Sequence, residues 1–300
     1  MLPPYINSPQ DLVTTREATR RGFADQAARK TAQAKPHVER AQAFHRQLAE
    51  VDTVEALTTD SALRSPLLAA VGLSDKARAR LTSVDLDTIL AVALTEIAQE
   101  FPDSWREQLV YRFLLNRGDT LGGSMRNLTG AAAGAQLATA IGGALQQRAT
   151  DFVMVTAPRN PQKVVRMSWG SRVLVFDRKP RFVDKSVDAI LVEADSLLVG
   201  GLSVLEQPGQ YVACGELKGG IDPAGADEHW KTARSAFERI RASFQRQGLV
   251  PPALFFVAAA IERAMADEIF ADLASGQLTY AANLTKPEQL GNLASWLVAL

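Results

Sequence analysis

Three ionisable side chains of complementary chemistry stand at two apolar stretches of the sequence. Glu216 and Lys218 end the run "QYVACGELK", and Asp188 opens the run "DAILVEA". Side chains at i and i+2 of a strand share a face, so a strand would hold Glu216 beside Lys218, and a neighbouring antiparallel strand could add Asp188. Two carboxylates are hard oxygen ligands that suit Mg²⁺. The metal would lower the pKa of a bound water and stabilise charge on phosphorus. The lysine would orient that water or help to neutralise the developing charge.

The alternative for Glu216 and Lys218 is an ordinary cross-strand pair on the surface. The apolar run before Glu216 carries little other charge, which favours a polar group that emerges from a core strand, where charge needs a reason. Asp184 is a rival for the upstream carboxylate, and we prefer Asp188 because it directly enters the apolar run. Glu96, in a predicted helix, could contribute a further carboxylate to the metal site.

The segment after the lysine, "GGIDPAGADEHWKTA", is dense in conformationally special and ionisable residues. Its glycines would let the backbone approach a ligand closely. Asp222 could accept a hydrogen bond from the N4 amine of cytosine, or it could be a turn residue before Pro223. A neutral His229 near a metal-bound water could accept or position its proton, or it could simply pack beside Trp230.

Other residues could contact phosphates or bases. Lys231 and Arg234 lie one turn into a predicted long helix, and the alternative is that they are surface charges. The segment "GDTLGGSMRN" could present backbone amides and the side chains of Ser124, Arg126 and Asn127, or it could be a structural turn. It is not a nucleotide-binding P-loop, because no Gly-Lys-Ser/Thr follows.

The overall composition excludes some classes of protein. The formal net charge of the 300 residues is zero, so nothing global indicates nucleic acid or membrane, although a local basic cleft is compatible with it. With one cysteine, Cys214, the chain can form neither an internal disulfide framework nor a thiolate metal cluster. The N-terminal sequence has no apolar signal core, and the longest low-charge run is too short and too rich in Gly and Gln to span a bilayer. We therefore expect a cytoplasmic protein without a membrane partner.

The elements that must position these residues change in character near residue 150. Before it, segments rich in Ala, Arg, Gln and Glu predict helices, including one over 84–101, one from Asp103 to a stop at Gly118, and one over 127–148. After it, β-branched and aromatic runs predict strands that alternate with helices over 226–248, 262–276 and 286–300. We expect an α/β (α+β) fold, with a helical region over residues 1–110 and a mixed central β-sheet flanked by helices over 111–300.

The stretch "ELKGGIDPAGADEHWKTA" closely resembles the active-site region of the BsoBI/AvaI-like type II restriction endonucleases, which belong to the PD-(D/E)xK superfamily. The positions that match the family's metal-binding Asp, its Glu-x-Lys and its following His are Asp188, Glu216, Lys218 and His229. The resemblance is strong over 214–240, fair at 117–127 and 184–193, and absent before residue 100. The upstream "VDKSVDAI" lacks the literal Pro-Asp of the superfamily signature.

The resemblance implies a catalytic role for those four residues, with Mg²⁺ bound by Asp188 and Glu216, and a base-reading role for Asp222. It implies sequence-specific hydrolysis of both strands of double-stranded DNA, leaving 5′-phosphates, at a short palindrome that contains a C·G pair. A palindrome suits a two-fold homodimer, so we expect residues 1–110 to help dimerise and grip DNA. A cognate DNA methyltransferase is expected as a partner in the same system.

Three alternatives differ in what the chain would act on. The first is a repair or recombination nuclease that has the same metal site but selects DNA structures rather than sequences. The second, an inactive binding protein of the same fold, is disfavoured because such a copy has no need to keep Asp188, Glu216 and Lys218. The third, a metal-dependent enzyme acting on small molecules, is disfavoured because no nucleotide-binding glycine motif follows a predicted strand.

Overall fold

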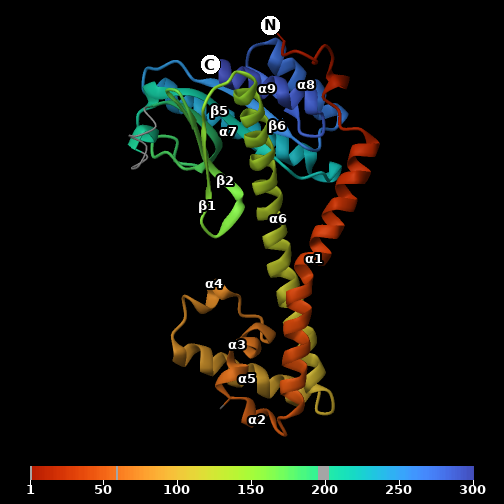
Figure 1. Cartoon of the computed structure of the whole chain (residues 1–300). Coiled ribbons are helices and arrows are strands. Elements are labelled where there is room, and N and C mark those ends of the chain that lie inside the picture. Colours follow the sequence, from red (N-terminus) through yellow and green to blue (C-terminus); the bar gives the residue numbers. More distant parts are fainter. Residues whose placement is uncertain (1, 59, 195–202) are drawn as a thin grey trace. The chain divides into compact units, whose positions relative to one another are not determined.

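The computed structural model describes residues 2–58, 60–194 and 203–300, and it confirms the predicted α/β class. The contacts within the chain define two compact units. The helical unit consists of residues 25–126, and the sheet unit consists of residues 1–24 and 127–300. Two long helices, α1 (Arg16–Ala49) and α6 (Trp105–Gln147), have residues in both units (Figure 1).

The helical unit packs short and long helices around its own apolar core. Besides its parts of α1 and α6 it contains α2 (Val54–Leu57), α3 (Ser61–Ala70), α4 (Asp75–Arg78) and α5 (Ser83–Glu100). The predicted helix over 84–101 is α5, and a capping box fixes its start: the Thr82 amide donates to Asp85 at 2.9 Å and the Asp85 amide donates to the Thr82 hydroxyl at 3.2 Å. The core includes Phe44, Leu48, Leu63, Leu67, Leu90, Leu94, Leu109 and Phe113.

Helix α6 shows that the predicted helix end at Gly118 is wrong. The helix continues through "GDTLGGSMRN" to Gln147, and Gly118 lacks the positive φ that is typical of a glycine ending a helix. A glycine inside a helix costs about 1 kcal/mol relative to alanine. Leu121 and Met125 are buried within this stretch, and burial of such apolar side chains works against that cost. Residue 110, where the two predicted regions meet, also lies inside α6.

The sheet unit is organised around a mixed seven-stranded sheet in the described part of the chain, with spatial order β1 to β7. Its strands are β1 (Val153–Ala157), β2 (Asn160–Trp169), β3 (Arg172–Arg178), β4 (Val187–Glu193), β5 (Tyr211–Lys218), β6 (Ala253–Ala258) and β7 (Tyr280–Asn283). Strands β1 to β5 pair antiparallel, whereas β6 is parallel to both β5 and β7. Strand β5 therefore lies where the sheet changes from antiparallel to parallel pairing.

Helices cover both faces of this sheet. Successive residues of a strand point to opposite faces, and in the central strands both sets are buried. On one face, Cys214 and Phe256 belong to a cluster with Trp230 and Phe237 of α7 (Ala226–Arg246) and with residues of α8 (Arg263–Ala274). On the other face, a second cluster joins alternate residues of the same strands to α6 and α9 (Pro287–Ala299). The predicted helices over 226–248, 262–276 and 286–300 are thus confirmed as α7, α8 and α9. The strand that carries Glu216 is held from both sides.

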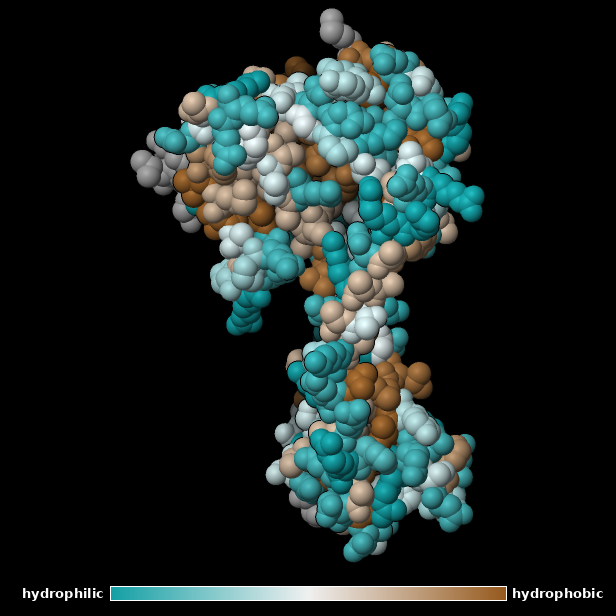
Figure 2. All heavy atoms as spheres, turned by 45° about the vertical axis from the view of Figure 1, so that its right-hand side comes forward, coloured by the Kyte–Doolittle hydropathy of each residue, from teal (hydrophilic) through white to brown (hydrophobic). Residues whose placement is uncertain are grey.

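Apolar side chains also reach the surface of the chain. On the face drawn in Figure 2 the helical unit is mainly hydrophilic, with a local group of hydrophobic residues. The most exposed large apolar side chains of this unit include Val84, Val92, Tyr111 and Leu115. By length and composition alone α6 could cross a membrane, but core helices of soluble proteins also meet that criterion.

Candidate active site

Strands β4 and β5 bring Asp188, Glu216 and Lys218 together. The antiparallel register aligns Ala189 with Gly215, which sets Asp188 and Glu216 side by side, as the sequence predicted. The Lys218 Nζ atom lies 3.1 Å from Asp188 Oδ2 and 2.8 Å from Glu216 Oε2. The amide of Leu217 donates to Asp188 Oδ2 at 2.9 Å and fixes that carboxylate against the strand. One ammonium is therefore shared by two carboxylates.

When both carboxyl groups are ionised, this cluster carries a net negative charge. Glu216 is only 3% exposed, and its burial raises the pKa of its carboxyl to about 7, with the Asp188 charge adding to the effect and Lys218 opposing it. Burial lowers the pKa of Lys218, but the carboxylates of Glu216 and Asp188 more than offset this, so the ammonium stays charged. A divalent cation would relieve the repulsion between the two carboxylates.

The donor set fits a cation that keeps part of its water shell. Within the described residues no third His, Cys, Asp or Glu completes a cluster with Asp188 and Glu216 that could hold a metal by protein ligands alone. Mg²⁺ is commonly held by one or two carboxylates together with waters and substrate phosphate oxygens. These two residues are thus suited to Mg²⁺ rather than to a fully protein-coordinated metal.

His229 stands in the first turn of α7 and packs against the glycine loop that follows β5. A Cβ atom at Gly220 would lie only 3.0 Å from the imidazole Cε1, so glycine makes room for the ring. Burial lowers the pKa of His229, and the positive charge of Lys218 lowers it further. Its Nδ1 atom is buried and has no hydrogen-bond partner in the part of the chain that the structure describes. The structure therefore brings a neutral imidazole into the electrostatic neighbourhood of Lys218.

Asp222 lies in the loop between β5 and α7 and is exposed. Its Oδ1 atom accepts a hydrogen bond from the Ala224 amide at 3.0 Å, where it caps the 3-10 helix η5 (Pro223–Gly225). The alternative role of Asp222, as a turn residue before Pro223, is thus present in the structure. The exposed carboxylate keeps acceptor capacity for another donor.

The basic residues of α7 have partners within the chain. Lys231 forms an ion pair with Asp227 at 2.6 Å. Arg234 lies 2.9 Å from Glu268 and 3.8 Å from Asp272 of α8. Both are exposed, so these pairs are screened by solvent and add little to stability. An anionic ligand could displace them at small cost.

Ser124, Arg126 and Asn127 lie inside α6, and the prediction that their segment forms a loop or turn is wrong. The backbone amides of this stretch are used within the helix, so they are not free to bind phosphate. The Ser124 hydroxyl donates to the Thr120 carbonyl at 3.0 Å. The three side chains are exposed, and Ser124 and Arg126 belong to the helical unit, whereas Asn127 belongs to the sheet unit.

The rival carboxylate Asp184 is not part of this cluster, and Glu96, the candidate for a further carboxylate, belongs to the other unit. Asp184 precedes β4 at a positive φ of 59°, is exposed, and pairs with Lys179 at 3.0 Å. Glu96 is exposed on α5, within the helical unit. Asp188 is the upstream carboxylate that contacts Lys218.

A small cavity of about 80 Å³ beside Asp188 adds two residues that the sequence analysis missed. Lys163 of β2 and Asp177 of β3 line it and form an ion pair at 2.7 Å. They reach the site because β3 pairs with β4, where Phe176 and Arg178 are opposite Ala189 and Val187. No local motif marks either residue, so only the order of the strands could have indicated them.

Comparisons with known proteins agree over nearly the whole chain. The family model "Restriction endonuclease BsobI" matches residues 3–168 and 159–300. The chain is 38% identical over 312 residues to the type II restriction enzyme AvaI of Nostoc sp., and the alignment covers 99% of this chain and 98% of that protein. It is 36% identical over 313 residues to the type II restriction enzyme BsoBI of Geobacillus stearothermophilus, and that alignment covers 98% of this chain and 97% of the relative. The similarity includes the helical unit as well as the strands that carry Asp188 and Glu216.

Proposed function

The chain belongs to the BsoBI/AvaI family of type II restriction endonucleases, and from this premise we propose that it cleaves both strands of duplex DNA at a short palindromic site, with Mg²⁺ as cofactor. The observation that carries the proposal is the cluster of Asp188, Glu216 and Lys218, in which one ammonium meets two carboxylates at 2.8–3.1 Å. That arrangement has an excess of negative charge at the end of a buried strand. A structural ion pair would need only one carboxylate.

In this proposal, Asp188 and Glu216 hold the metal ion. When bound, Mg²⁺ supplies an acidified water and charge stabilisation at the phosphorus atom. The ammonium of Lys218 donates hydrogen bonds toward the attacking water or a phosphate oxygen and stabilises the added negative charge. A water oxygen would bond to phosphorus and give up a proton, while the bond to the 3′-oxygen breaks and that oxygen takes a proton from solvent, which leaves a 5′-phosphate and a 3′-hydroxyl.

His229 is the proposed proton acceptor or positioning group for the attacking water. A base must be neutral to accept a proton, and both burial and the Lys218 charge lower the pKa of this imidazole. Among the described residues its Nδ1 atom has no hydrogen-bond partner, so this nitrogen is not already used by a contact within them. These features support His229 as the base.

The proposed DNA contacts come from exposed side chains around the site. Asp222 would accept a hydrogen bond from a cytosine N4 amine, which places a C·G pair in the target. Lys231 and Arg234 would exchange their solvent-exposed carboxylate partners for DNA phosphates. Ser124, Arg126 and Asn127 would contact the DNA through side chains alone, since their amides are used within α6.

A palindromic target suits a homodimer in which each subunit cuts one strand. We infer that the helical region helps to dimerise and to grip DNA, and that a cognate methyltransferase protects the host sequence in a cytoplasmic restriction-modification system. Residues 1–110 and 111–300 are the proposed grip and catalytic regions.

The test is a digestion of unmethylated phage DNA with Mg²⁺, followed by sequencing of the fragment ends. Discrete fragments with a common palindrome at every end are expected, and Glu216→Ala or Lys218→Ala should abolish cutting while sequence-specific binding remains. Normal cutting by either variant would remove those residues from the mechanism. Cutting only of flaps, junctions or mismatches, without a common sequence, would favour the structure-selective nuclease instead.

A further inference from the structure

Three helices of the helical unit line a cavity of about 350 Å³ that is open to solvent and that none of the proposed site residues lines. Arg40, Phe44 and Gln47 face it from α1, and Phe113 and Arg117 face it from α6. Spacings of three and four residues put these side chains on one face of each helix. Ser65 of α3 lines the remaining wall. The cavity thus combines an aromatic wall with polar and cationic groups.

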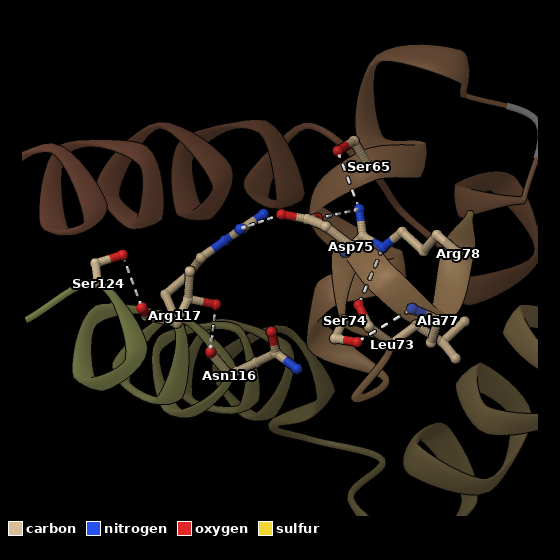
Figure 3. A network of polar contacts seen from close by, with 10 residues as sticks. Ser65, Leu73, Ser74, Asp75, Ala77, Arg78, Asn116, Arg117 and Ser124 are labelled. Atoms are coloured by element: carbon tan, nitrogen blue, oxygen red, sulfur yellow. Dashed lines mark hydrogen bonds and ion pairs between the residues drawn. The ribbon is translucent and has the colours of Figure 1, made fainter. Parts of the chain in front are cut away.

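Positive charge is in excess around this cavity. The side chains of Arg117 and Arg78 are only 13% and 15% exposed, and buried charges are normally paired. Among the ion pairs of the described residues they share one carboxylate, that of Asp75, at 3.8 and 3.7 Å (Figure 3). Asp75 is itself 71% exposed, so it is a weak counter-charge. Arg40 adds a third guanidinium that has no ion pair within the described ranges.

Two buried nitrogen atoms beside the cavity have no hydrogen-bond partner among the described residues. They are Arg117 Nε and Nδ1 of His37, which lies one turn before Arg40 on α1. Burial lowers the pKa of His37, and the charges of Arg40 and Arg117 lower it further. Burial likewise lowers the pKa of Arg78, and the charge of Arg117 lowers it further, while the carboxylate of Asp75 raises it. The cations therefore repel one another, and an anion in the cavity would relieve that repulsion.

We propose that this cavity binds a phosphate group, with Arg40 and Arg117 as the direct donors. The planar guanidinium matches phosphate oxygens and donates paired hydrogen bonds to them. Arg117 is held in place because its guanidinium lies over the Phe113 ring, 5.3 Å from the centroid. The Ser65 hydroxyl lies 3.4 Å from Arg78 Nη1 and can turn toward a ligand.

The size of the cavity restricts what carries the phosphate. Small-molecule sites occupy roughly 300–1,000 Å³, so this cavity admits a free phosphate, a mononucleotide, or one phosphate of a DNA backbone. The rings of Phe44 and Phe113, with centroids 5.4 Å apart, form its apolar wall. The shared chemistry is a phosphate held by two arginines, and it does not depend on the proposed catalytic residues.

The first experiment is calorimetric titration of the intact, metal-free protein with inorganic phosphate at constant ionic strength. One site per chain is expected, and Arg40→Gln and Arg117→Gln should each weaken binding roughly 10- to 100-fold, the effect of losing a hydrogen bond to a charged group. Arg80→Gln, which removes an exposed arginine outside the cavity, is the matched control. Lys218→Ala should leave this binding intact, which separates the cavity from the candidate active site. Circular dichroism checks folding, and Arg40 is exposed, so its variant tests the proposal even if Arg117→Gln does not fold.

A second experiment distinguishes the sources of the phosphate. Binding of a labelled duplex is measured in EDTA over a range of salt concentrations. A decrease of about 0.9 in the slope of log K against log salt for Arg40→Gln identifies a DNA phosphate as the ligand. Weakened phosphate binding with an unchanged slope identifies a free phosphate compound. If Arg40→Gln and Arg117→Gln match Arg80→Gln in both experiments, the proposal is wrong, whether or not the protein cleaves DNA.

Discussion

The substitution Glu216→Gln should stabilise the metal-free protein at alkaline pH, although it should abolish cleavage. Glu216 is buried beside Asp188, and this environment raises the pKa of its carboxyl from the ordinary 4.5 to about 7. A glutamine cannot ionise, yet it keeps the shape of the side chain and can still accept the hydrogen bond from Lys218. The variant therefore removes a buried negative charge without opening a cavity.

The sign and size of the effect follow from proton linkage. Because the folded-state pKa is raised, the folded protein binds more protons than the unfolded chain between pH 4.5 and about 7. The stability that the protonated carboxyl contributes is complete below pH 4.5 and is lost as the pH rises through 7. At about 1.4 kcal/mol per pKa unit, the wild-type protein loses about 3 kcal/mol over this range as an upper limit. The advantage of Glu216→Gln should thus grow from near zero at pH 4.5 to about 3 kcal/mol at pH 8.

Urea unfolding in EDTA at several pH values measures this difference. Tryptophan fluorescence is a suitable signal because Trp169, Trp230 and Trp296 all lie in the sheet unit. Glu193→Gln, an exposed carboxylate on β4, is the control and should show little pH-dependent gain. A Glu216→Gln variant that is equally or less stable than wild type at pH 8 would refute the reasoning. Mg²⁺ should stabilise the wild type more than Glu216→Gln, because the metal needs the ionised carboxylate.

The sequence contained enough information to predict the centre of the site. The spacing of Glu216 and Lys218 decides that they share a face of one strand, and the apolar run before Glu216 predicts that this strand is buried. The pairing with the Asp188 strand was an assumption about a distant partner, and the antiparallel register of β4 and β5 confirms it. Local patterns sufficed for this candidate site because the positions of its three side chains depend on alternation within two short strands.

Other features depend on contacts between distant residues, which local patterns do not encode. Helix α6 continues through Gly118 despite the low helix propensity of glycine, and Leu121 and Met125 are buried in this stretch, which favours the helix. The pairing of Lys163 with Asp177 beside the site requires the order of three strands. Each of these features needed the tertiary structure.

The remaining predictions concern catalysis and base recognition. His229→Ala should lower the cleavage rate by roughly 10²- to 10⁴-fold, measured in single-turnover assays, and full activity would leave the imidazole a packing role. Asp222→Ala should reduce discrimination at a C·G pair by about 1–3 kcal/mol, measured by competition between cognate and altered duplexes, and unchanged discrimination would make it a turn residue only. Gly220→Ala should also slow cleavage, because the added methyl carbon would lie 3.0 Å from the imidazole Cε1, too close for the ring to keep its position. Gly225→Ala places its methyl 3.7 Å from the same atom, an ordinary contact, so it should slow the reaction far less. If the two alanine variants lost activity equally, the imidazole position would not limit the rate.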